Sequence, residues 1–97
     1  MDLHQINVGE LRAFNTFLKK YRSDLEGLDR QLTSKLQQVG TTWTDKAYQQ
    51  FRSHVEGTLL KQHKEDLTKI SQATAVLDQL IREYEQIEAT KRRLSSF

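Results

Sequence analysis

Three histidines, His4, His54 and His63, are the side chains in this sequence that could perform acid–base or metal chemistry near neutral pH. His63 and Asp66 are three residues apart and would share one face of a helix, whereas Glu56 could approach His54 only poorly. A zinc site needs three or four converging ligands, and the chain has no cysteine to supply them. We therefore expect these histidines on a solvated helix surface, with no metal, no cofactor and no catalytic residue.

No recognised catalytic pattern is present to change this expectation. The sequence lacks a G-x-S-x-G nucleophile turn, a P-loop and a Rossmann glycine fingerprint. The basic run Lys91-Arg92-Arg93 suits the last turn of a helix, where cations interact favourably with free carbonyls. The 15 basic and 13 acidic residues are interspersed along the chain, so no stripe for phosphates is predicted. We expect neither an enzyme nor a nucleic-acid-binding protein.

The composition is that of a small all-helical protein. In 97 residues there is no proline, 36% are hydrophobic and 29% are charged. No apolar run reaches the length of a signal peptide or a membrane span. We expect one domain over 1-97 that is cytoplasmic, or secreted without a cleavable signal peptide, and that is not inserted in a membrane. One domain this small buries little core alone, so a partner chain is expected.

Apolar residues in the first half follow a heptad pattern. They alternate in steps of three and four until Lys35 interrupts them: Leu11, Phe14, Leu18, Tyr21, Leu25, Leu28, Leu32 and Val39. The pattern predicts a helix over about 8-39, with Met1 to Asn7 loose. Phe17 and Leu36 widen the apolar stripe beyond a two-stranded coil, which favours a helix bundle.

The segment 40-45 is predicted to be a turn. Gly40 could end the first helix in the left-handed conformation. Thr42 and Asp45 have the spacing of a capping box for the next helix, and Thr44 is an alternative N-cap. Trp43 at the tip either packs under the bend or projects to a partner, and we expect it to be partly buried.

A second helix is predicted over about 46-90, followed by a frayed tail. Its apolar residues recur at four-residue steps and then at heptad steps: Ala47, Phe51, Val55, Leu59, Ile70, Ala73, Leu77, Leu80, Tyr84 and Ile87. The 11 residues from Leu59 to Ile70 suggest a hendecad that relaxes the supercoil. Leu60, Leu67 and Ile81 widen this stripe also. The predicted fold is an all-α antiparallel two-helix hairpin whose wide stripes dimerise into a four-helix bundle.

Twelve residues form the predicted core of this hairpin and its dimer. They are Leu11, Phe14, Leu18, Tyr21, Leu25, Leu28, Leu32, Phe51, Leu59, Ile70, Leu77 and Tyr84.

The turn motif Trp43-Thr44-Asp45, followed by Ala47, Tyr48 and Phe51, resembles the WXG family of small helical hairpin proteins. That family is best known as substrates of type VII secretion in Gram-positive bacteria and mycobacteria. Asp45 stands where the family has glycine, as in W-x-D variants found also in bacteria without that machine. Tyr84 and Glu88 resemble the Y-x-x-x-D/E secretion signal that exported members carry near the end of the second helix.

This resemblance implies a dimeric interaction protein, either a secretion substrate or an adaptor recognised by a secretion ATPase or a carrier protein. A homodimer is expected, and a heterodimer is the alternative. The rival function is a cytoplasmic structural scaffold or helical partner protein with no export.

Overall fold

The computed structural model describes residues 6–95, and in this range it contains helices and no strands. Helix α1 spans Val8–Gly40, and helix α2 spans Lys46–Val55. A π-helical turn, η2, covers Glu56–Leu60, and helix α3 covers Lys61–Ser95. The expected loose segment Met1 to Asn7 lies mostly outside the described residues, as does His4.

Local capping explains where α1 begins. The Asn7 side chain accepts a hydrogen bond from the Glu10 backbone N–H at 3.1 Å, as an N-cap asparagine does. The helix then runs without interruption for 33 residues, one residue beyond the predicted end.

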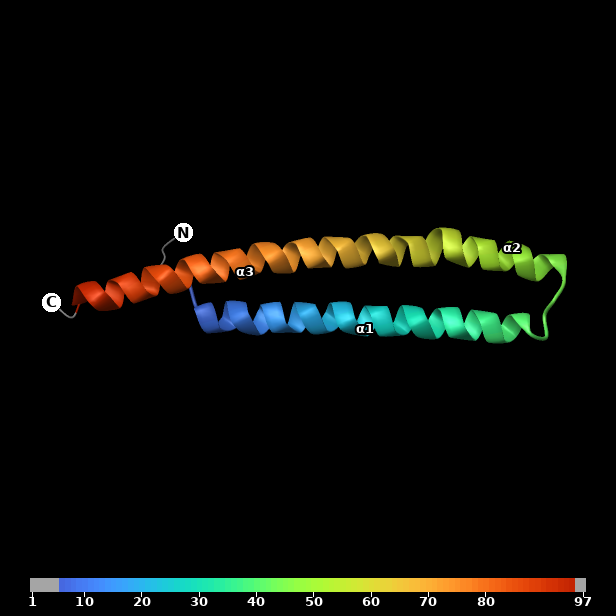
Figure 1. Ribbon diagram of the computed structural model, residues 1–97, viewed down its shortest axis with the longest axis horizontal. Helices are drawn as coiled ribbons and strands as arrows, with labels where there is room; N and C mark the ends of the chain where they lie inside the picture. The colour runs from blue at the N-terminus through green and yellow to red at the C-terminus, as the bar shows by residue number, and fades with distance from the viewer. Residues whose placement is uncertain (1–5, 96–97) are drawn as a thin grey trace.

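The second half of the chain forms one long helical rod in which α2, η2 and α3 follow one another (Figure 1). The expectation of a frayed tail after residue 90 is wrong for residues 91–95, because α3 continues to Ser95. Figure 1 shows this end of α3 projecting past the beginning of α1. Arg92 and Arg93 lie in the last turn, where positive charge suits the helix dipole.

The two rods lie side by side and run in opposite directions, joined by the turn at 41–45 (Figure 1). The molecule is elongated, with extents of 77 × 19 × 16 Å. Two helices cannot enclose an interior on all sides, so few side chains are buried. The buried hydrophobic residues are Val8, Leu36, Tyr48, Val55 and Ile81.

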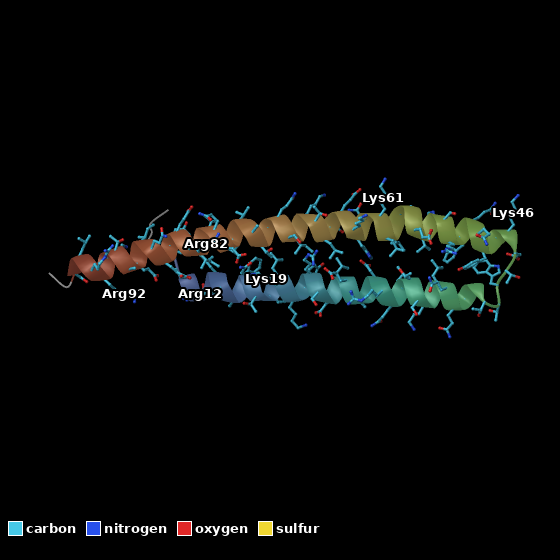
Figure 2. The ribbon with its side chains drawn as sticks, in the orientation of Figure 1. Arg12, Lys19, Lys46, Lys61, Arg82 and Arg92 are labelled. Carbon is cyan, nitrogen blue, oxygen red and sulfur yellow. The ribbon has the colours of Figure 1, made fainter. Side chains whose placement is uncertain are left out.

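Polar contacts join the two rods along much of their length. Arg12 and Lys19 reach from α1 toward α3 (Figure 2), where they pair with Glu85 at 2.7 Å and with Asp78 at 3.2 Å. Because these pairs are exposed, each stabilises the fold by less than about 1 kcal/mol.

The π-turn replaces the predicted hendecad. Side chains that face α1 recur at three- and four-residue steps on both sides of η2, but Val55 and Leu60 are five residues apart. A π-helical turn accommodates one residue more than an α-helical turn, so both Val55 and Leu60 can face α1. The change of period predicted from Leu59 to Ile70 is therefore wrong in position, because residues 61–70 are regular α-helix and the irregular turn is Glu56–Leu60.

Candidate interaction surface

The turn between the rods is closed by Asp45. Its side chain accepts a hydrogen bond from the Tyr48 backbone N–H at 3.2 Å, which makes it the N-cap of α2. The two predicted threonine caps are therefore wrong: the Thr42 hydroxyl donates instead to the Val39 carbonyl at 3.3 Å, and Thr44 precedes the cap. An aspartate at this position of the motif thus has a definite structural role.

Gly40 is needed for space rather than for a left-handed conformation. No described residue has a positive φ, so the predicted left-handed helix end is wrong. A Cβ on Gly40 would lie 2.5 Å from the Tyr48 hydroxyl oxygen and 2.6 Å from its Cζ. The absence of a side chain lets the Tyr48 ring pack against the last turn of α1, where its hydroxyl donates to the Leu36 carbonyl at 2.9 Å.

Trp43 is partly buried, as predicted, and it packs against the small apolar cluster of Leu36, Tyr48 and Val55. Its ring meets Tyr48 edge-on at a centroid distance of 5.5 Å and lies 5.8 Å from Phe51. Such aromatic pairs contribute about 0.5–1.5 kcal/mol beyond the area they bury. The tryptophan therefore fixes the turn against the first residues of α2.

The histidines do not converge. His63 contacts Asp29 on α1, while Asp66 accepts a hydrogen bond from Gln62 at 3.0 Å instead of pairing with His63. His54 is exposed on α2. Among residues 6–95, no group of three His, Cys, Asp or Glu side chains could hold a metal ion.

The apolar seam predicted for the first helix is divided by the structure. Four of its leucines are half-buried between the rods: Leu11, Leu18, Leu25 and Leu32. The residues between them, Phe14, Tyr21 and Leu28, are exposed instead. The next residue along the chain faces α3 in each case, and these three residues are Asn15, Arg22 and Asp29.

Each of these polar residues has a partner on the second rod. The Asn15 side-chain amide donates to Asp78 at 2.7 Å, Arg22 donates to Ser71 at 2.6 Å, and Asp29 contacts His63. The hydrogen bond from Asn15, followed by that from Lys19, lowers the pKa of the Asp78 carboxyl. Away from the turn, the interior of the helix pair therefore alternates apolar residues with paired polar residues.

The predicted core of the second helix is divided in the same way. Ile70, Leu77 and Tyr84 are half-buried against α1, whereas Phe51 and Leu59 are exposed.

The residues predicted to widen the apolar stripes toward a second chain mostly pack within the helix pair instead. Leu36 and Ile81 are buried within the helix pair, Leu60 and Leu67 are half-buried there, and of the five only Phe17 is exposed.

Most of the exposed large apolar side chains of both rods lie on one side of the molecule. On α1, Arg12 and Lys19 come one residue after the inward-facing Leu11 and Leu18. On α3, their respective partners Glu85 and Asp78 come one residue after the inward-facing Tyr84 and Leu77. These ion pairs show that the residues that follow inward-facing positions lie on the same side of the molecule in both rods. Residues that precede an inward-facing position by one must therefore share the opposite side. A groove lined by Tyr21, Asp66 and Lys69 joins the rods on that side.

We call this surface the outer apolar face. Its nine large side chains are between 38% and 61% exposed, and they are Phe14, Phe17, Tyr21, Leu28, Phe51, Leu59, Val76, Leu80 and Ile87. So many exposed large apolar side chains on one side are unusual on a monomeric soluble protein, which makes this face the candidate interaction surface. Sequence reasoning had named five of these residues as core, and the 3–4 periodicity alone could not separate inward from outward positions.

The predicted signal residues lie near the open end of the pair. Tyr84 is half-buried, and together with Ile6, Val8 and Glu88 it lines a small hollow there. Glu88 is one turn further along α3, 3.8 Å from Arg92.

No protein-family model, curated protein or solved structure matches this chain. None of the helices in residues 6–95 is both long enough and apolar enough to span a membrane. The class of protein must therefore be inferred from the surface itself.

Proposed function

We propose that this chain is a non-enzymatic, WXG-like interaction protein that works by binding a second helical chain. The antiparallel helix pair would be a hairpin that two copies complete, forming a four-helix bundle with the outer apolar faces in its centre. One observation carries the proposal: nine large apolar side chains of both rods are exposed on a single side, while Asn15 and Arg22 take positions inside the pair.

The extent of the face fits such a dimer. Nine half-exposed side chains offer an apolar area on the order of 800 Å² per copy, which is the size that stable protein–protein interfaces bury on each partner. Within each rod most residues of the face recur every seven positions, as in Phe14, Tyr21 and Leu28. Another helix whose apolar residues have the same spacing can pack between them. A second copy carries the same spacing, and closed two-fold dimers are the commonest assemblies of identical chains.

Oligomeric state tests the proposal directly. Sedimentation equilibrium should give a dimer at micromolar concentration, and the midpoint of thermal unfolding should rise with protein concentration because association stabilises the folded state. A folded monomer that binds no helical partner would rule out this function. A monomer that dimerises only with another small helical chain would replace the homodimer with the heterodimer.

We further propose that the dimer is a secretion substrate or an adaptor, recognised by a secretion ATPase or a carrier protein. Support comes from the turn, because Asp45 caps α2 and so preserves a Trp-x-Asp bend between two long helices. Replacement of Glu88 by alanine tests this reading, since Glu88 contributes no apolar side chain to the interior. Export in the native host should fall while the melting temperature is unchanged, and unchanged export would reject the signal.

The scaffold without export is a second candidate, favoured by the position of Tyr84. This side chain is half-buried beside Val8 and so contributes to packing whether or not it is a signal. If the chain is a scaffold, Tyr84→Ala should lower the melting temperature and Glu88→Ala should have no effect in any assay.

A further inference from the structure

The π-turn η2 joins two parts of the second rod whose heptad patterns are out of phase by one residue. Before the turn, Tyr48, Arg52 and Val55 face α1 at steps of four and three. After it, the inward-facing residues from Leu60 to Tyr84 resume steps of three and four. A continuous α-helix would have required an inward residue at position 59, where Leu59 is instead exposed.

The same extra residue keeps the outward positions in line. Phe51 and Leu59 are eight residues apart, and from Leu59 onward the column recurs every seven residues, through Asp66 and Ala73 to Leu80 and Ile87. One residue turns an α-helix by about 100°, so without the π-turn Phe51 would point about 100° away from Leu80. With it, Phe51 at the turn and Leu80 near the open end share one side of the rod.

We propose that the π-turn is a phase-correcting element that brings Phe51 and Leu59, at the tip of the hairpin, into the surface that binds the second copy. This inference rests on the proposed dimer. It adds that the contact extends along the full length of the hairpin, including the tip, and is not confined to the region around Phe14 and Leu80.

The area requirement supports full-length contact. Near the open end the face has six of the nine large side chains, Phe14, Phe17, Tyr21, Val76, Leu80 and Ile87. Without Phe51 and Leu59 the available apolar area falls below what a standard interface buries on each partner. Local features suit the role as well: a Cβ on Gly57 would meet nothing within 4 Å, and η2 contains no buried residue. Within η2 only Leu60 packs against the apolar cluster of Leu36, Tyr48 and Val55, so residues 56–59 are not dictated by packing against α1.

The test compares tip and body substitutions in the full chain. Phe51→Ser and Leu59→Ser should each raise the dissociation constant of the dimer about tenfold, as Leu80→Ser should, because each removes a half-exposed apolar side chain from the interface. Gln50→Ser, next to Phe51 but outside the column, is the matched control and should leave the constant unchanged. Far-UV circular dichroism at high concentration reports whether each variant remains helical.

A deletion of Gly57 tests the phase itself. Because the deletion removes the extra residue itself, the rod should become continuous α-helix with Phe51 and Leu59 seven residues apart in the same column, and the dimer should keep its affinity. Insertion of one alanine after Gly57 should instead turn the tip by about 100° relative to the body, so dimer affinity should fall by more than either tip substitution causes. The inference is overturned if Leu80→Ser weakens the dimer tenfold while both tip variants keep the wild-type dissociation constant. That outcome would leave the proposed dimer intact, whereas an unmodified chain that is monomeric would refute the dimer itself.

Discussion

The inner and outer sides of α1 differ most clearly at three pairs of adjacent residues. Phe14, Tyr21 and Leu28 face outward, and the residue after each, Asn15, Arg22 and Asp29, faces α3. In an isolated helix pair the apolar member of each pair would be expected inside. The reversed arrangement leaves apolar side chains exposed on the side that the proposed dimer would bury.

The region near the turn has the opposite arrangement. There Lys35 is exposed and Leu36 is buried with Tyr48 and Val55, so this end has an apolar core of its own. The polar pairs elsewhere contribute little net stability, but each joins one residue to one partner and so favours a single register of the two rods. We infer that the turn supplies stability within one chain, the polar pairs supply register, and the outer apolar face supplies association.

The largest effect should come from the outer side. Phe14→Ser combined with Tyr21→Ser should raise the dimer dissociation constant about 100-fold, equivalent to roughly 3 kcal/mol, because two half-exposed aromatic rings leave the interface. Sedimentation equilibrium measures the change. Thr16→Ser with Ser23→Ala, two exposed positions outside the face, provides the control. Unaltered self-association of the aromatic double variant would show that the face is not an interface.

The apolar core at the turn is tested by Gly40→Ala. The added methyl group would overlap the Tyr48 ring, so the ring must move and its hydrogen bond to Leu36 must lengthen or break. We expect a loss of about 2 kcal/mol in the free energy of unfolding, measured by urea denaturation. Gly57→Ala is the matched control, and with open space around it that variant should be neutral or stabilising. Equal effects of the two substitutions would contradict the packing role of Gly40.

Asn15→Leu tests whether the inner polar residues stabilise the pair. Asn15 is 5% exposed, and its Oδ1 is buried without a hydrogen-bond partner. A leucine of similar size removes this unpaired group, and Asp78 retains its ion pair with Lys19. The free energy of unfolding should therefore increase by about 1 kcal/mol. Thermal and urea denaturation at fixed protein concentration measure the change. A loss of stability would mean that the bond from Asn15 to Asp78 contributes more than the apolar replacement.

The smallest effect concerns the charge of Asp78. Hydrogen bonds from Asn15 and Lys19 hold the pKa of this carboxyl below its ordinary value of 3.8. The folded state therefore binds this proton less readily than the unfolded state, and the contribution of Asp78 to stability is present above pH 3.8. It is lost as the pH falls from there through the lower folded pKa. Asp78→Asn should flatten the pH dependence of the melting temperature in that acidic window, and an identical profile for both proteins would exclude the contribution.

The sequence by itself determined that the chain consists of two long helices with one turn near Trp43. Periodic apolar residues and the absence of proline are local properties, and they predict helices wherever three- and four-residue steps continue. The start at Val8 and the partial burial of Trp43 also followed from local chemistry. Five of the nine residues on the outer apolar face are on the list of predicted core residues, although they face outward.

Only the tertiary structure decided which side of each helix faces inward. Because the apolar stripe of α1 is wide, a rotation of the helix about its own axis by about 50° would decide whether Phe14 or Asn15 faces α3. Both orientations have the same three- and four-residue periodicity along the sequence. The choice depends on partners far along the chain, since Asn15 is paired with Asp78, 63 residues away. The same holds for Gly40, whose role depends on the Tyr48 ring, and for the π-turn, whose extra residue lets Val55 and Leu60 both face α1.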